Sequence, residues 1–387
     1  MRLPVSTLCL VALPFAACTP EVIEPEETTL FGAVTITEIA TADDGLDGAR
    51  DLDFNPEVDG ELWVQNRNDD ATLTIRKVGT ADQTILLRKD PFALHFMEET
   101  AAISFSTGNK FGSCGESRNT YDGTQPFNDF MGPALWSSAD EVFALSNPEA
   151  VAQNPFNSDL GSHLDMMHET PLCMGIAWVS DNIYYVFEGL EITEEEALTF
   201  PANKRPRPRK MGIARYDFKT DHGPGFDYHA DGTVERFTDT DVKRVADVPS
   251  HLVYDHNSEL LYVADTGNAR IQVLDTSRTI ALTQFRGFET MVQELDGAKW
   301  TTFLGEEAEF QAPSGLALKD GVLYVGDNLT STVSAFDLEG NLIDTLELDI
   351  AEGGLMGMRV SPDGGSLYVV DFIGDRVLRV EGLAVPK

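Results

Sequence analysis

The chain has 387 residues, of which 64 are acidic and 28 are basic, so its formal net charge is −36. This excess of negative charge repels a phosphate backbone, which excludes DNA and RNA as partners. Hydrophobic residues make up 42% of the chain, enough to build an ordered core. A chain above about 250 residues usually divides into domains unless it is built from repeats.

The first 17 residues are typical of an export signal. Arg2 precedes an apolar run at 3–17 that is too short to span a bilayer. The run ends Phe15-Ala16-Ala17-Cys18, which resembles a bacterial lipoprotein signal and implies cleavage before Cys18 with lipid on its thiol. An ordinary secretory signal is the alternative. Residues 18–29, rich in Glu and Pro, are expected to form a flexible tether for a domain at 30–387.

Short apolar runs separated by turn residues recur along the rest of the chain. Residues 249–275 contain three of them, at 252–254, 260–264 and 271–274. Runs of this length, rich in Val, Leu, Ile and Tyr and separated by Asn and Gly, predict antiparallel strands. None of the three has the length and 3.6-residue period of a helix. Because the phrase repeats about every 40–50 residues, it favours an all-β propeller.

Seven pairs of first and second strands can be aligned, at 51–54 with 61–65, 92–97 with 101–106, 131–136 with 141–145, 174–179 with 182–187, 250–254 with 260–265, 314–318 with 322–326 and 356–360 with 366–370. We therefore expect a seven-bladed β-propeller, with six blades as the alternative if two pairs share one blade. Residues 110–128 are expected to form a long loop. The last blade stops after its third strand, so residues 30–40 are expected to supply its fourth strand and close the ring.

Residues 261–271 read Leu-Tyr-Val-Ala-Asp-Thr-Gly-Asn-Ala-Arg-Ile, and weaker copies stand at 323–333 and 367–377. This pattern resembles an NHL repeat, and the clear resemblance covers residues 249–383. NHL-type propellers include many binding modules and the lyase that cleaves peptidyl-hydroxyglycine. The resemblance to that lyase implies zinc held by histidines from different blades at the axis, with Tyr and Arg nearby.

Histidines near the expected inner strands are candidate ligands for zinc or a similar divalent metal. His251 occupies the position where matching repeats carry Gly132, Gly175, Gly315 and Gly357. His163 and His168 precede one expected inner strand, and His95 lies in another. Since inner strands converge, His251 with His163 or His168, and His95 as an added ligand, would share one ion. The alternative is that each imidazole bonds only to backbone or water.

The polar, Gly-rich segment 111–123 is a candidate site loop. It carries a base, a cation and a phenol, which are Glu116, Arg118 and Tyr121. It also carries Cys114, which with Cys173 is left over once Cys9 is removed and Cys18 is lipidated. In an oxidising compartment the two form a disulfide, or else they remain buried thiols or serve a site.

Two further segments are unusual in charge. Residues 217–231 hold four acids that are candidates for calcium, Asp217, Asp221, Asp227 and Asp231, although a solvated turn is the alternative. Residues 204–210 hold five cations, Lys204, Arg205, Arg207, Arg209 and Lys210. These cations either form a solvated insertion or contact anionic lipid. The repeated acids Asp265, Asp327 and Asp371 are expected to cap turns.

The sequence thus predicts a monomeric, lipid-anchored protein of the bacterial cell envelope, periplasmic or on the cell surface. Its expected function is to bind a small-molecule or protein ligand. The alternative is a metal-dependent lyase or hydrolase-like enzyme acting at the mouth of the central channel.

Overall fold

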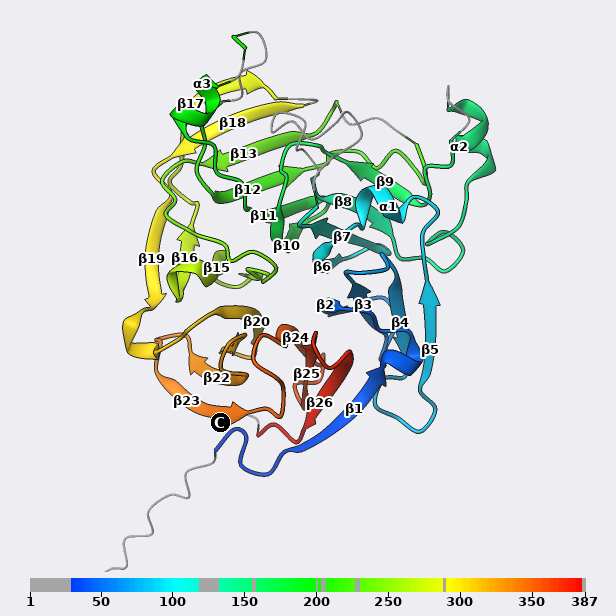
Figure 1. Ribbon diagram of the computed structural model, residues 1–387, viewed down its shortest axis with the longest axis vertical. Helices are drawn as coiled ribbons and strands as arrows, with labels where there is room; N and C mark the ends of the chain where they lie inside the picture. The colour runs from blue at the N-terminus through cyan, green and yellow to red at the C-terminus, as the bar shows by residue number, and fades with distance from the viewer. Residues whose placement is uncertain are drawn as a thin grey trace, which may run out of the picture.

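The computed structural model describes residues 29–117, 132–154, 158–199, 201–202, 207–226, 230–287 and 290–384. Six β-sheets are arranged as blades around one axis (Figure 1). The export signal, Cys18 and nearly all of the tether lie outside the described residues. No helix in the described part of the chain has the length and apolar character needed to cross a bilayer.

The innermost strand of each blade contacts the innermost strands of the two neighbouring blades, so these strands form the closed hub of the ring. From blade 1 to blade 6 they are β2 (Ala49–Phe54), β6 (Thr100–Ser106), β10 (Cys173–Ser180), β14 (Leu252–Asp255), β20 (Pro313–Lys319) and β24 (Leu355–Val360).

Three further strands complete each blade outward. The second strands are β3 (Leu62–Asn66), β7 (Lys110–Gly115), β11 (Ile183–Glu188), β15 (Leu260–Asp265), β21 (Val322–Asp327) and β25 (Ser366–Asp371). The third strands are β4 (Thr72–Arg76), β8 (Ala134–Ser137), β12 (Gly212–Asp217), β16 (Arg270–Asp275), β22 (Thr332–Asp337) and β26 (Arg376–Glu381). The fourth strands are β5 (Thr84–Arg88), β9 (His163–Met166), β13 (Thr233–Phe237), β19 (Lys299–Leu304), β23 (Leu342–Glu347) and β1 (Thr35–Thr41).

The prediction of seven blades is wrong, and the six-bladed alternative is correct. Two of the expected strand pairs fall in blade 2. Residues 92–97 contain the short helix α1 (Ala93–Phe96) instead of a strand, and residues 141–145 form turns. The strand at 131–136 is β8, the third strand of blade 2 and not an inner one.

The second strand of blade 2, β7, was not predicted because its glycines give it a weak strand pattern. β7 occupies the start of the segment expected to be a loop. A Cβ at Gly112 would lie 2.8 Å from Ile176 and 2.9 Å from Tyr184 of blade 3, and one at Gly115 would lie 2.6 Å from the Glu98 carbonyl oxygen. Glycine lowers strand propensity, but only glycine fits where neighbouring chains approach this closely.

The N-terminal strand closes the ring, as predicted. β1 pairs antiparallel with β26, the third strand of blade 6, with Thr35 opposite Glu381 and Thr41 opposite Arg376. Its hydrogen bonds cover an edge that would otherwise be open to other chains. The ring is thus closed by joining the two ends of the chain without a covalent bond.

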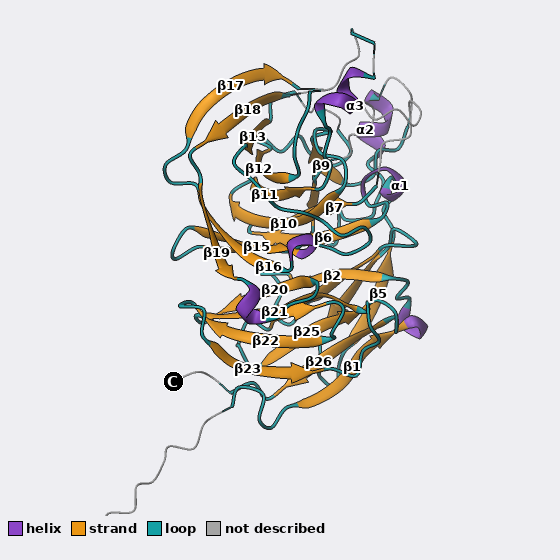
Figure 2. Cartoon of the chain, turned by 60° about the vertical axis from the view of Figure 1, so that its left-hand side comes forward, coloured by secondary structure: helices purple, strands orange, loops and turns teal. Residues whose placement is uncertain are grey.

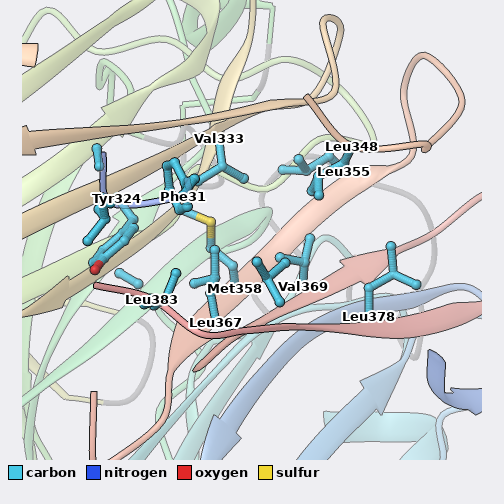
Figure 3. Close-up of a cluster of buried hydrophobic side chains, with 14 of the residues drawn as sticks. Phe31, Tyr324, Val333, Leu348, Leu355, Met358, Leu367, Val369, Leu378 and Leu383 are labelled. Atoms are coloured by element: carbon cyan, nitrogen blue, oxygen red, sulfur yellow. The ribbon is translucent and has the colours of Figure 1, made fainter. Parts of the chain in front are cut away.

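Residues just ahead of β1 reinforce this closure. Phe31 packs in the apolar cluster between blades 5 and 6, with its ring centroid 6.3 Å from that of Tyr324 (Figure 3). The Phe31 backbone N–H donates to the Asp344 carboxylate at 2.8 Å, and the Ala384 N–H donates to the Leu30 carbonyl at 3.1 Å. The N-terminal segment therefore binds both to blade 5 and to the end of the chain.

Blade 3 is wider than the others. The hairpin β17 (Ile280–Arg286) and β18 (Met291–Asp296), inserted between β16 and β19 of blade 4, adds to the outer edge of blade 3. β18 runs parallel to β13, and the enlarged sheet fans out at one side of the molecule (Figure 2). Two more short helices, α2 (Pro148–Gln153) and α3 (Glu194–Leu198), lie in connections of blades 2 and 3.

The acidic residues of the repeat motif have the expected structural role. Asp265, at the end of β15, accepts hydrogen bonds from the Lys243 backbone and from Arg270 Nε at 2.8 and 2.7 Å. Asp371 accepts from Arg376 in the same way at 2.7 Å. The Asp and Arg of the motif therefore lock the turn between second and third strands to the chain entering the blade.

Candidate functional site

The connections that precede inner strands and those that follow second strands lie on one face of the ring, here called the upper face. In blade 1 the start of β2 is opposite the end of β3, with Ala49 paired to Asn66, and in blade 2 Thr100 is paired to Gly115. The candidate loop at 111–123 therefore leaves β7 on this face. Its residues Arg118 and Tyr121 lie outside the described residues, whereas Glu116 is described.

A cavity of about 350 Å³ opens at the centre of the upper face. Its walls carry four carboxylates and one guanidinium, and they come from blades 1 to 4. The lining residues are Arg67, Glu98, Glu99, Glu116, Ser117, Leu172 and Asp247. Three of them, Glu99, Leu172 and Asp247, have φ of +51°, +54° and +63°. Such left-handed backbone is uncommon for residues with side chains, and it often gathers at functional sites.

Glu116 anchors one wall of the cavity. Its carboxylate accepts a hydrogen bond from Arg244 Nη1 at 2.5 Å and from the Asp247 backbone N–H at 3.1 Å. Arg50 Nη2 lies 3.5 Å from the other carboxylate oxygen. Because both oxygens are engaged, this group is better suited to holding the wall in place than to the general-base role expected from sequence.

Arg50 forms the floor beneath the cavity. Its side chain is completely buried, and among the described residues none of its three guanidinium nitrogens has a hydrogen-bond partner. Burial lowers the pKa of Arg50 to about 10, against the opposing effect of Glu116. A buried cation of this kind is retained because the nearby carboxylate of Glu116 compensates it.

Arg67 links the two more exposed acids of the rim. Its Nη2 lies 2.8 Å from Asp247 Oδ1 and 3.5 Å from Glu99 Oε1. Glu98 differs from these acids, because among the described residues it has no ion-pair partner. Partial burial, together with the nearby Asp70 and Glu99, raises the pKa of Glu98.

A disulfide joins the walls of the cavity. Cys114 of β7 is bonded to Cys173 of β10, with the two Cα atoms 5.5 Å apart. Cys114 lies two residues before Glu116, and Cys173 directly follows Leu172. The bond therefore holds blades 2 and 3 together at the mouth of the channel.

His251 fills the middle of the channel. It comes from blade 4, and its Nε2 lies 3.3 Å from the Ala101 carbonyl of blade 2 and 3.6 Å from Asp51 Oδ2 of blade 1. Burial lowers the pKa of His251 although Asp51 opposes this, so the imidazole is neutral and donates Nε2–H to Ala101. The hub is thus packed across its width, and the upper cavity has a closed floor.

The prediction of an ion shared by His251 with His163, His168 and His95 is wrong for the described residues. His163 lies in β9, the outermost strand of blade 2, and its Nδ1 donates to the Leu160 carbonyl at 2.6 Å. His168 Nε2 lies 3.3 Å from Nε2 of His95, which belongs to α1. His95 was misplaced because α1 was taken for an inner strand, whereas His163 and His168 do precede the inner strand β10 but belong to the outer edge of blade 2 and the connection that follows it.

The described residues contain one group of metal-capable side chains whose ligand atoms all lie within 4.8 Å of one another, Asp165, His222 and Asp231. His222 Nε2 lies 3.1 Å from Asp231 Oδ1 and 3.9 Å from Asp165 Oδ2. Of the four acids expected to bind calcium, Asp217 pairs with Lys219, Asp221 lies 3.2 Å from Lys110 Nζ and Asp231 lies 3.1 Å from His222 Nε2, whereas Asp227 lies outside the described residues.

The described part of the basic segment, residues 207–210, places its cations in different surroundings. Lys204 and Arg205 lie outside the described residues. Arg207 stacks on the Phe285 ring at 3.8 Å, whereas Arg209 turns inward. A contact between this segment and lipid remains a prediction.

Sequence reasoning missed most of the upper cavity. Arg50, Arg67, Arg244, Glu98 and Asp247 belong to no motif, and they come from three different blades. Their common signal is position, because each stands near the start of an inner strand or the end of a second one. That signal becomes readable only after the blades are correctly assigned.

No family model matches the chain. Over 118 residues it is 31% identical to NHL repeat-containing protein 2 of Gallus gallus, a match that covers 30% of this chain and 14% of that protein. The chain thus matches about a seventh of that relative's length.

Solved structures of similar fold include a protein of unknown function from Bacteroides thetaiotaomicron, with a TM-score of 0.51 and 9% identity over 90% of this chain and 76% of that one. A luciferin-regenerating enzyme aligns with a TM-score of 0.53 and 13% identity over 91% of this chain and 97% of that one. At these identities the likeness shows the fold and not the activity. The closed ring of blades shows a β-propeller, and the motif at 261–271 together with the match to NHL repeat-containing protein 2 supports an NHL-like one.

Proposed function

We propose that this propeller is a binding module that takes a positively charged organic ligand in the upper cavity. The observation that carries the proposal is Glu98, a carboxylate on the cavity wall that has no ion-pair partner among the described residues and whose pKa is raised. A ligand ammonium beside Glu98 would stabilise its charged form.

The charges around the cavity favour a cation over an anion. Its four lining carboxylates face one lining guanidinium, and the buried Arg50 and the partly exposed Arg244 offset the charge of Glu116. The four carboxylates and the three guanidiniums of Arg67, Arg50 and Arg244 together leave one negative charge in excess, and we assign it to Glu98, the acid without an ion-pair partner among the described residues. The net charge of −36 over the whole chain would further draw cations toward the molecule.

Size and shape support a small ligand. About 350 Å³ falls within the range of roughly 300–1,000 Å³ usual for small-molecule sites. The packed hub at His251 closes the channel below, so a ligand would enter and leave by the upper face. The disulfide and the Glu116 network hold the walls before a ligand arrives, which lowers the entropy cost of binding.

Titration calorimetry with spermidine, and with n-butylamine as a singly charged probe, tests the proposal. We expect binding that weakens as salt rises, since the rim charges are partly exposed to solvent. Glu98→Gln is expected to weaken binding by about fivefold or more. Glu339→Gln, which removes one exposed acid from blade 5, is the matched control and should bind as the wild type does. Equal affinity in the two variants would refute the proposal.

The cellular setting is part of the proposal and rests on the sequence. A lipid on Cys18 and a tether at 18–29 would hold the propeller at the cell envelope. Mass spectrometry of the mature N-terminus tests this, because a diacylglycerol adduct on Cys18 is expected and a free cysteine or a cleavage elsewhere would contradict it.

A second candidate function is metal-dependent chemistry, and the observation that favours it is the group of Asp165, His222 and Asp231. A mixed set of imidazole and carboxylate ligands suits zinc or manganese. The residues would hold the ion between blade 2 and the connection that leaves β12, away from the upper cavity.

A further inference from the structure

A cavity of about 400 Å³ lies in blade 3, away from the channel. Its walls come from the segments at 191–194 and 208–210 and from strands β13 and β18. Buried Ile192 and Phe237, with Pro208, give it an apolar lining. Apolar cavities with a few convergent polar groups are the usual form of small-molecule sites.

Two arginines contribute the polar groups at the floor, and they differ in their partners. Arg236 Nε lies 2.9 and 3.0 Å from the two carboxylate oxygens of Glu188, and its Nη2 donates to the Glu169 carbonyl at 2.7 Å. Glu188 also accepts from the Thr170 hydroxyl. The Glu188 carboxylate is therefore fully engaged by Arg236 and Thr170.

Arg209 has no such carboxylate. Among the described residues none lies within ion-pair distance of it, and its buried Nε has no hydrogen-bond partner. Its side chain donates from Nη1 to the Glu169 carbonyl at 3.3 Å. Burial and the neighbouring Arg236 cation lower the pKa of Arg209. The fork geometry of this guanidinium matches a carboxylate, and among the described residues Glu188 and Glu169 act on it only from beyond ion-pair distance.

The backbone holds Arg209 in position without a ligand. Its N–H and carbonyl exchange hydrogen bonds of 2.8 Å with the carbonyl and N–H of Ile192, forming an isolated β-bridge. The main chain that carries this lining residue is thus fixed. A substitution of the side chain leaves these two hydrogen bonds intact.

The rim has the opposite charge. Glu191, Glu194 and Glu294 line the cavity around a single lysine, Lys210. The floor carries two guanidiniums against the carboxylate of Glu188. A ligand that fits both would place a carboxylate on Arg209 and an ammonium toward the rim, with an apolar body between Ile192 and Phe237.

We propose that this cavity binds a small apolar zwitterion of the amino-acid type, with its carboxylate on Arg209. This site is separate from the upper cavity and does not depend on the function proposed for it. The carboxylate would supply the partner that Arg209 lacks, and the acidic rim would favour zwitterions over simple anions.

Titration calorimetry with L-leucine tests the proposal. L-leucinamide is the probe that lacks the carboxylate, and 4-methylpentanoate is the probe that lacks the ammonium. We expect L-leucine to bind, L-leucinamide to lose at least about tenfold in affinity, and 4-methylpentanoate to bind more weakly than L-leucine. Arg209→Gln should lose at least about tenfold as well. Arg207→Gln, at the cation stacked on Phe285, is the control and should bind as the wild type does.

Thermal unfolding of both variants confirms that they fold. Glu98→Gln in the upper cavity should leave L-leucine binding unchanged, which separates this test from that of the proposed function. Absence of L-leucine binding in the wild type up to about 10 mM would overturn the proposal. So would equal affinity of the wild type and Arg209→Gln, or of L-leucine and L-leucinamide.

Discussion

Reducing the Cys114–Cys173 disulfide is expected to destabilise the protein strongly. The bond spans a sequence separation of 59 residues, and closing a loop of that length removes chain entropy worth about 4 kcal/mol from the unfolded state. Both sulfurs sit in the buried apolar cluster between blades 2 and 3, where the free thiols still fit. The expected loss in free energy of unfolding is therefore about 4 kcal/mol, with little contribution from packing.

The measurement is urea unfolding followed by tryptophan fluorescence, with and without a phosphine reductant. The double variant Cys114→Ala/Cys173→Ala is the control, and its midpoint should not respond to the reductant. A wild-type difference below about 1 kcal/mol would refute the reasoning, because it would mean that the loop is already constrained in the unfolded state. The same reduction should weaken ligand binding in the upper cavity, since the bond adjoins Glu116 and Leu172.

Three further outcomes follow from other parts of the fold. Phe31→Ala should lower the free energy of unfolding by about 3 kcal/mol, because it opens a cavity between blades 5 and 6. Ile36→Ala is the control: Ile36 lies in β1 and is 42% exposed, so its loss should cost less than about 1 kcal/mol in the same urea titration. Because burial lowers the pKa of His251, this histidine takes up a proton at higher pH in the unfolded state than in the folded state. The free energy of unfolding should therefore fall as the pH drops below about 6.5. If the same dependence of stability on pH persists in His251→Gln, the reasoning is contradicted. Inductively coupled plasma mass spectrometry of protein purified without a tag should find one equivalent of a divalent metal. The metal should be lost in His222→Ala and kept in the control His256→Ala. A metal-free wild type would rule out the metal site.

The sequence alone was sufficient for the class of fold and for its closure. Alternating apolar runs and turn residues are local properties, so they marked the first and second strands of blades 1, 3, 4, 5 and 6 directly, although β17, β18 and β19 were missed. The missing fourth strand after Glu381 and the apolar residues at 30–40 were also readable, because an open edge requires a partner. The Asp residues of the repeat motif were rightly expected to be structural, since every copy needs the same turn, whereas their pairing with Arg270 and Arg376 emerged only from the structure.

The tertiary structure decided the blade count and the sites. Gly112 and Gly115 weakened the strand signal of β7 because their side-chain space is taken by blade 3 and by the chain before β6, a constraint that no local pattern contains. The upper cavity joins residues from four blades, and the Arg209 cavity depends on a main-chain bridge to Ile192 and on the engagement of Glu188 by Arg236. Which charge is paired and which is left without a partner depends on distances across the fold, and these arise only when the blades pack around their axis.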